Sequence, residues 1–328
     1  MKNWIEFKGT KDQWNQYVDQ FSGNYRQLWE WGEYKNSSSW EVSRLIYLNE
    51  NRVTHSVQIL VKKFFFVCLV YIPGGISNKE FNGQSLEIEE IIFKKFKNFL
   101  TVIRFDSNYK LKKEIRLQLI KDSWKRPAYN INRGLSLEFQ LDQKSILETA
   151  TRKWRYNYRK AIKNNYQILI DRYPLKFNSE IMSVANEMLS LKKDNVDRQE
   201  AVLELSNYFK KNLIVACCIS DNNEFLGFRS ALLFGNRSFD IFGAVSIKGR
   251  KLKIGYPLLV NLLDECKNRG AINFNFGGYE PSKNTGQFKI NSGADLYEYV
   301  GEWEKTNSPF FSRVLNILIS IRKWIYFI

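Results

Sequence analysis

A lysine beside an aromatic residue, Phe288-Lys289, follows a strand-like run that ends in two glycines. In the run from 271 to 276 apolar residues alternate with polar ones, which predicts a strand. The pair Gly277-Gly278 at its exit predicts a backbone that turns sharply or lets another group come close. A cation held beside such a strand end could stabilise negative charge on a reacting oxygen. An ordinary surface loop after the strand is the alternative that this stretch leaves open.

The charge of the chain points to an anionic partner. With 328 residues the chain is long enough for two domains. It carries 50 Lys+Arg against 34 Asp+Glu, a formal net charge of +16. Nucleic acid, a pyrophosphate-bearing substrate or the acidic face of a membrane would suit this charge. An AT-rich genome, which raises the lysine content, is the alternative explanation.

Residues for metal or triad chemistry are scarce. His55 is the single histidine and lies in a strand-like run, so we expect a structural role for it, no metal site and no Ser/His/Asp triad. The four cysteines have no regular spacing, which is typical of reduced thiols in a cytosolic protein. We see no signal peptide and no apolar run long enough to span a bilayer, so we expect a cytoplasmic protein.

A segment from Ala150 to Ile170 interleaves cations with aromatic side chains. On a helix these residues cannot share one face, so the segment would offer a buried aromatic side and a cationic side. Arginine binds phosphate oxygens and aromatic rings stack on bases, which suits a phosphate- or nucleic-acid-facing helix. A solvated basic helix is the alternative. The cations are Arg152, Lys153, Arg155, Arg159, Lys160 and Lys163, and the aromatics are Trp154, Tyr156 and Tyr158.

Each half of the chain runs through helices, an antiparallel meander, a helix and a strand. In the first half two β-rich runs, Val53–Leu60 and Lys63–Val70, precede Pro73-Gly74-Gly75. This order is that of an acyl-CoA N-acyltransferase fold. We therefore predict an α/β (α+β) protein of two tandem N-acyltransferase-like domains with a cleft between them. The predicted bounds are 1–145, joined by the tail 305–328, and 146–304, which carries the transfer site.

The loop before the second helix departs from the acyl-CoA pattern. An acyl-CoA enzyme holds pyrophosphate on the amides of a glycine-rich loop at the helix N-terminus, and the usual form is Arg/Gln-x-x-Gly-x-Gly/Ala. Here Arg250 to Gly255 reads RKLKIG, so Lys253 stands at the place of the first glycine. The departure weighs against an acyl-CoA donor without excluding it.

Eight elements, in order between residues 25 and 304, resemble the Fem family of aminoacyltransferases. These are transfer-RNA-dependent enzymes that attach amino acids to peptidoglycan precursors. The elements are WEWGEYKNSSSW, YIPGG, IRFD, TRKWRYNYRKAIKNNYQI, the Gly227–Val245 meander, FNFGGYE, GQFK and EYVGEWE. The resemblance implies the tandem fold, no cofactor, charged tRNA as donor co-substrate and acyl-CoA as the alternative donor.

The resemblance also implies roles for single residues. Lys289 would be catalytic, donating to the oxygen that becomes negative when an amine attacks an ester carbonyl. Lys35 and Arg198 would contact a phosphate of the acceptor, while Asp106 and Tyr256 would line the acceptor cleft. Further substrate contacts would come from Gly277, Gly278 and Phe288, and donor contacts from Arg152, Lys153, Arg155, Arg159 and Lys160. Such a reaction needs no metal and no covalent nucleophile.

Two departures from the family bear on the acceptor. Asn275 stands where the family commonly has an aspartate, and the second half lacks the long helical arm that some members insert. The acceptor, a phosphate-bearing sugar or peptide precursor, therefore stays open. The tail 308–328 is apolar with four basic or aromatic anchors, which suits a helix in a membrane interface. Packing of this tail on the first domain is the alternative.

Together these observations predict a cytoplasmic transferase, peripheral at the membrane face if the tail binds there. It would form an amide between an aminoacyl or acyl group and an amine on a cell-envelope precursor, either peptidoglycan or a nucleotide- or lipid-linked polysaccharide sugar. Two alternatives remain open. One is an acyl-CoA-dependent N-acyltransferase that acts on an amino sugar, and the other is a non-catalytic RNA- or phosphate-binding protein.

Overall fold

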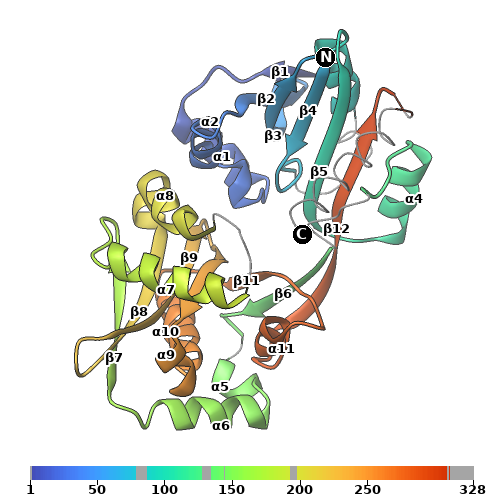
Figure 1. Ribbon diagram of the computed structural model, residues 1–328. Coiled ribbons are helices and arrows are strands. Elements are labelled where there is room, and N and C mark those ends of the chain that lie inside the picture. The colour runs from blue at the N-terminus through green and yellow to red at the C-terminus, as the bar shows by residue number, and fades with distance from the viewer. Residues whose placement is uncertain are drawn as a thin grey trace. The chain divides into compact units, whose positions relative to one another are not determined.

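The computed structural model describes residues 2–78, 87–127, 134–143, 145–192, 198–308 and 310. Within them the chain forms two compact units (Figure 1). Unit 1 runs to Leu135 and resumes at Glu298, and unit 2 is Ser136–Tyr297. The bounds predicted from the sequence lie further along the chain at both crossings. The predicted membrane or packing role of the tail concerns residues that, beyond Phe310, lie outside the described part.

Unit 1 is built on a sheet in the order β1-β2-β3-β4-β5-β12. The pair β4–β5 is parallel, whereas β1–β2, β2–β3, β3–β4 and β5–β12 are antiparallel. The strands are β1 (Lys2–Glu6), β2 (Glu41–Asn49), β3 (Arg52–Phe64), β4 (Val67–Ile72), β5 (Leu100–Lys110) and β12 (Asp295–Thr306). The helices are α1 (Lys11–Gln20), η1 (Tyr25–Gln27), α2 (Trp29–Asn36), α3 (Ile88–Lys95) and α4 (Lys113–Lys121).

The hairpin turn between β3 and β4 lies at Phe65-Phe66. The sequence predicted two runs separated before Lys63, so the turn falls inside the second predicted run and that prediction is wrong. Turns usually carry Gly, Asn or Asp, which adopt a positive φ with little strain. Phe65 has a φ of 48°, and an aromatic turn of this kind gives no sequence signal.

Unit 2 is built on a second sheet in the order β6-β11-β10-β9-β8-β7. The pair β10–β11 is parallel, whereas β6–β11, β9–β10, β8–β9 and β7–β8 are antiparallel. The strands are β6 (Leu135–Gln140), β7 (Tyr166–Arg172), β8 (Leu213–Ser220), β9 (Phe225–Phe234), β10 (Arg237–Val245) and β11 (Asn273–Gly278). The helices are α5 (Ile146–Thr149), α6 (Arg152–Ala161), α7 (Asn178–Lys192), α8 (Arg198–Phe209), η3 (Lys210–Asn212), α9 (Ile247–Lys251), α10 (Gly255–Asn268) and α11 (Asn284–Ile290).

Helix α10 precedes β11 and fixes where that strand begins. Its apolar residues recur at helical spacing and are buried against β8, β9 and β11, which gives the helix its position. Gly270 has a φ of 88° and follows the last turn, where the amide of Ala271 donates to the carbonyl of Cys266 (3.0 Å). This is a glycine-terminated helix end. The chain therefore leaves α10 at a fixed point and enters β11 beside β10.

Two predicted segments differ from the structure. The basic helix ends at Ala161, and Tyr166–Arg172 forms β7, because Asn164 hydrogen-bonds the carbonyls of Lys160 and Ala161 and closes the helix. The loop expected before Lys289 is helix α11. Gly286 within it lowers the helix propensity of this segment, so the sequence gives no helix signal. A glycine is needed there because a Cβ would lie 2.3 Å from the carbonyl oxygen of Glu280.

A search of the described residues for membrane-crossing helices finds none with sufficient length and apolar character.

Candidate active site

The strand β11, between β6 and β10, ends in open space. Phe274 and Phe276 are buried in the core of unit 2 and fix the strand between β6 and β10. Gly277 follows with a φ of 72°, a conformation that favours glycine. A Cβ added at Gly277 or at Gly278 would meet no atom within 4 Å. The backbone at this strand end is therefore accessible to another group.

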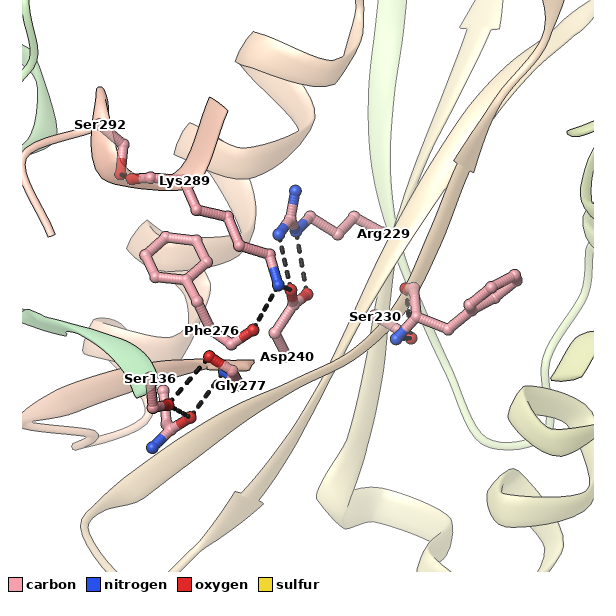
Figure 2. A network of polar contacts seen from close by, with 10 residues as sticks. Ser136, Arg229, Ser230, Asp240, Phe276, Gly277, Lys289 and Ser292 are labelled. Carbon is pink, nitrogen blue, oxygen red and sulfur yellow. Dashed lines mark hydrogen bonds and ion pairs between the residues drawn. The ribbon is translucent and has the colours of Figure 1, made fainter. Parts of the chain in front are cut away.

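Asn275 holds the turn at Gly277. Its Oδ1 accepts from the amide of Gly277 (2.7 Å), and its Nδ2 donates to Glu138 on β6 (2.9 Å). The hydroxyl of Ser136 donates to the carbonyl of Gly277 (2.9 Å), as Figure 2 shows. An aspartate at 275 would set a second carboxylate against Glu138, where an amide can donate. The amide at 275 therefore suits the carboxylate of Glu138 on the neighbouring strand.

Lys289 lies in the last turn of α11 and reaches back to β11. Its Nζ donates to the carbonyl of Phe276 (2.5 Å) and lies 3.7 Å from Oδ2 of Asp240 (Figure 2). Asp240 on β10 also receives both guanidinium N–H groups of Arg229 on β9, at 3.0 and 2.7 Å. A lysine ammonium has three donors. One of them has a hydrogen-bond acceptor among the described residues and Asp240 lies at ion-pair distance, so that a further N–H can serve a substrate oxygen.

Burial lowers the pKa of Lys289 below its ordinary value. The removal of water disfavours the charged ammonium, and the neighbouring Arg229 lowers the pKa further, whereas Asp240 opposes both by its negative charge and hydrogen bond. The side chain of Lys289 is 19% exposed, that of Arg229 is 14% and that of Asp240 is 10%. In such a partly dry site a donor acts on developing charge more strongly than in water.

An aromatic cluster lies behind Lys289. The Tyr256 ring packs edge to face on Trp154 (5.0 Å between ring centroids) and on Phe288 (5.1 Å). Asn157 donates to the Tyr256 hydroxyl (2.9 Å) and accepts from Lys253. The arginine next to Asp240 also lies over the Phe288 ring, at 5.6 Å. This packing joins α6, α10 and α11, so the basic helix and the Lys289 helix share one core.

The loop before α10 offers few amides to an anion. The amides of Arg250, Leu252, Lys253 and Ile254 donate to backbone carbonyls within 2.9–3.1 Å. In the first turn of α10 the amide of Tyr256 is likewise engaged, and Pro257 has no N–H. A pyrophosphate site needs such groups free. Lys253 stands where the acyl-CoA pattern has its first glycine, and it has the left-handed φ of 62° that favours glycine. The amides that would bind pyrophosphate are nevertheless engaged.

The cations of α6 point in two directions. Four of those predicted to face the donor, Arg152, Lys153, Arg159 and Lys160, are exposed. Arg155 instead donates to the carbonyls of Glu148 and Ala150 and is partly buried, so it secures the entry of the helix. Trp154 is 2% exposed and anchors the opposite face. The predicted division into an aromatic and a cationic side holds for Trp154 and for the partly buried Tyr158, whereas Tyr156 is 61% exposed and does not belong to the buried side.

In unit 1, Asp106 is a buried structural carboxylate. Its Oδ1 accepts from the amide of Gly74 (2.6 Å), and its Oδ2 pairs with Arg26 (2.7 Å). Burial by itself would lower the pKa of Arg26, but the charge of Asp106, with Tyr71 and Tyr25, outweighs it and raises that pKa. With both oxygens engaged and the side chain 3% exposed, Asp106 fixes the Pro-Gly-Gly turn. The predicted acceptor contact of Asp106 stays a prediction.

Lys35 lies on α2 with its Nζ over the rings of Tyr34 (4.4 Å) and Trp31 (5.1 Å). Such contacts hold an ammonium without neutralising it, and its predicted phosphate contact stays a prediction. Arg198 begins α8, and its side chain lies outside the described part of the structure.

Unit 2 thus brings together the predicted residues Tyr256, Gly277, Gly278, Phe288 and Lys289, while Lys35 and Asp106 lie in unit 1. Arg229 and Asp240 were not predicted as site residues. A single charge within each of two apolar strands, FRSALLF and SFDIFG, was the available signal. A hairpin between these strands brings the two charges together.

The remaining reactive groups lie in cores. Among the described residues no group of three or more His, Cys, Asp or Glu side chains could hold a metal ion. All four cysteines are buried free thiols, and burial raises the pKa of Cys68 to about 11 and of Cys218 and Cys266 to about 12. His55 is also buried, with its Nδ1 2.9 Å from the hydroxyl of Thr54.

No protein-family model and no curated protein sequence matches the chain. Solved structures nevertheless show its fold, which is that of two tandem N-acyltransferase-like units. The crystal structure of FemX superposes with a TM-score of 0.82 at 14% sequence identity, over 95% of this chain and 100% of FemX. The fold prediction is confirmed, and the family resemblance seen in the sequence leads to the same group of structures.

Two further solved structures share the tandem arrangement. L-PGS from Bacillus licheniformis has a TM-score of 0.61 at 16% identity, over 96% of this chain and 98% of that one. A tandem GNAT protein from the clavulanic acid biosynthesis pathway has a TM-score of 0.60 at 8% identity, over 94% and 99% of the two chains. At these identities the likeness concerns the fold, and function has to be argued from the site.

Proposed function

We propose that the chain is an aminoacyltransferase that forms an amide between an activated aminoacyl group and an amine on a cell-envelope precursor. The observation that carries this proposal is the Nζ of Lys289, held at the open end of β11 by Phe276 and Asp240. When the amine attacks the ester carbonyl, the carbonyl oxygen becomes negative, and an N–H of Lys289 donates to it. The C–N bond forms, the ester C–O bond then breaks, and the donor hydroxyl leaves with the proton that the amine loses. The likeness to FemX supports the same reaction class.

The contacts of Lys289 Nζ with Phe276 and Asp240 set the direction of that donor. The Phe276 carbonyl fixes Nζ beside the strand end, and Asp240 keeps the ammonium charged against the effect of burial. The open backbone at Gly277 and Gly278 leaves room for the substrate carbonyl. A placed donor that needs no rearrangement when charge develops contributes most of the acceleration in such reactions.

Charged tRNA is the donor that we propose. The resemblance to the Fem family implies it, and the exposed cations of α6 can contact phosphates beside the aromatic cluster that ends at Phe288. The loop before α10 supports this choice over acyl-CoA, because its amides are engaged in backbone hydrogen bonds. The acceptor in this proposal is a phosphate-bearing sugar or peptide precursor on the cytoplasmic side, with Lys35 as a phosphate contact.

The test compares two donors and two lysines. Protein and an amine-bearing precursor are incubated with labelled charged tRNA or with labelled acetyl-CoA, and the amide product is counted. We expect product with charged tRNA and none with acetyl-CoA. Product with acetyl-CoA alone would overturn the donor assignment, and tight RNA binding without product from either donor would favour the non-catalytic alternative.

The variant Lys289→Met should lower kcat/KM by at least about a hundredfold, as the loss of an oxyanion donor does. The matched control is Lys283→Met, a 66% exposed lysine at the start of the same helix that pairs with Glu280. We expect that control to keep its activity. Unchanged transfer by Lys289→Met, with the fold intact by circular dichroism, would remove the role of Lys289.

A further inference from the structure

Three consecutive phenylalanines form the tip of the β3–β4 hairpin in unit 1. Phe64, Phe65 and Phe66 are 51%, 98% and 62% exposed. A contiguous exposed apolar patch of this kind is uncommon in soluble chains and marks an interaction surface. Phe65 also adopts a φ of 48°, which is unfavourable for a bulky side chain. The hairpin therefore keeps an aromatic tip where folding alone would favour Asn or Gly.

The tip is held in place by its neighbours. Phe64 pairs with Val67 across the turn, and Val67 pairs in turn with Leu100 at the start of β5. The amide of Leu100 donates to the carbonyl of Phe66 (2.8 Å). The three rings thus project from a fixed end of the sheet, next to the 96–99 loop.

Lysines lie on this tip, which we call the Phe hairpin (residues 62–67), and in the segment that precedes β5. The segments 40–41, 61–67 and 94–100 contain five lysines and one acidic residue, Glu41. Glu41 pairs with Lys63 (2.7 Å). Lys62 lies over the rings of Trp40 (5.6 Å) and Phe64 (5.7 Å), and it can extend its ammonium away from an apolar layer. The lysines are Lys62, Lys63, Lys94, Lys95 and Lys97.

The end of the described chain leads to the same edge of the sheet. Asn307 follows β12 and bonds the amide of Thr101 and the carbonyl of Phe99, both at 2.9 Å. Phe310 is 77% exposed. The sequence after it, FSRVLNILISIRKWIYFI, is apolar with three basic residues. Asn307 is thus held beside the start of β5, which also contacts the Phe hairpin.

We propose that the Phe hairpin binds the surface of an anionic lipid bilayer. Its rings would enter the boundary between headgroups and acyl chains, and the lysines around it would contact the lipid phosphates. A projecting turn with three rings and no polar group at their tips suits a deformable apolar layer. Stacking of single-stranded RNA bases uses rings on a flatter platform. The proposal does not depend on the transfer reaction, because binding is measured without donor or acceptor.

The test is co-sedimentation of the full chain with vesicles. One set is phosphatidylcholine alone, and the other contains about one third phosphatidylglycerol. We expect binding to the anionic vesicles that weakens as salt is raised. Replacing the three rings together, Phe64→Ser, Phe65→Ser and Phe66→Ser, should weaken it at least about tenfold. The matched control is Leu117→Ser with Ile120→Ser, two side chains on α4 that are 56% and 55% exposed, and it should bind like the parent chain.

A second measurement locates the contact. The native thiols are buried with raised pKa values, so Phe65→Cys can be labelled selectively with a polarity-sensitive fluorophore. The emission should shift to the blue with anionic vesicles, and the same label at Leu117→Cys should not shift. The proposal is overturned if the parent chain does not bind vesicles, if the triple variant binds as tightly as the parent, or if the rings are needed for single-stranded RNA and not for lipid.

Discussion

Two strand ends in this molecule carry a pair of glycines, and they differ in what surrounds them. At the end of β4 in unit 1, a Cβ on Gly74 would lie 2.4 Å from the side chain of Asn24, and a Cβ on Gly75 would lie 3.0 Å from Ser107. At the end of β11 in unit 2, neither Gly277 nor Gly278 has a neighbour within 4 Å of that position. Unit 1 needs its glycines to pack closely, whereas unit 2 leaves its strand end open.

The charges at the two ends differ in the same sense. Each end has a carboxylate paired with an arginine, Asp106 with Arg26 and Asp240 with Arg229. The first carboxylate has its other oxygen on the amide of Gly74, and the second also faces a lysine, Lys289. One end is closed and neutral, while the other is open and carries a surplus cation. The tandem fold thus reserves one strand end for structure and makes the other available for chemistry.

Removing each arginine should break this comparison most visibly. Arg26→Met leaves the buried Asp106 without its counter-charge and should lower the free energy of unfolding by about 3–5 kcal/mol. Arg229→Met should cost less, because Lys289 still faces Asp240. Urea unfolding of both variants measures the difference. An equal loss from the two substitutions would mean that Lys289 does not compensate Asp240.

Alanine substitutions at the glycines of the two strand ends should give smaller losses of stability, which still differ between the two ends. Gly74→Ala and Gly277→Ala both place an L-residue at a positive φ, near 78° and 72°, at about 1–2 kcal/mol each. Gly74→Ala should cost about 1–3 kcal/mol more, because only its Cβ meets a neighbour. Melting temperatures rank the two variants against Gly278→Ala, which should be close to the parent chain. A larger loss from Gly277→Ala would contradict the open strand end.

The smallest expected effects concern pH. If the Lys289 ammonium acts in transfer, activity falls as pH rises through its pKa, which lies below the ordinary lysine value. Asp240 raises this pKa and Arg229 lowers it. Asp240→Asn should therefore move the alkaline limb of the kcat/KM profile to lower pH, and Arg229→Met should move it to higher pH. Shifts in the same direction, or a limb that persists in Lys289→Met, would assign the limb to another group.

Much of the second unit could be predicted from its sequence. The alternation before Gly277 places β11, and the lysine beside Phe288 is the cation at its end, since short-range patterns decide strands and turns. The partners of that lysine could not be predicted, because they depend on register. A bulge between Asp240 and Phe242 sets which β10 side chains face β9, and no local pattern records it. The ion pair of Asp106 with Arg26 could not be predicted either, because the two residues lie far apart in the sequence.

The contact between Asn275 and Glu138 has a consequence for how this chain can vary. The two side chains meet across β11 and β6, an amide N–H against a carboxylate oxygen. Replacing Asn275 alone by aspartate sets two carboxylates against each other, whereas replacing Glu138 alone by glutamine keeps an acceptor for the Asn275 N–H. Relatives that carry an aspartate at this position should therefore carry a neutral or basic partner on the neighbouring strand. We therefore expect aspartate at 275 and glutamate at 138, positions 137 residues apart, to exclude each other among relatives, so that the two positions change together in the descent of this site.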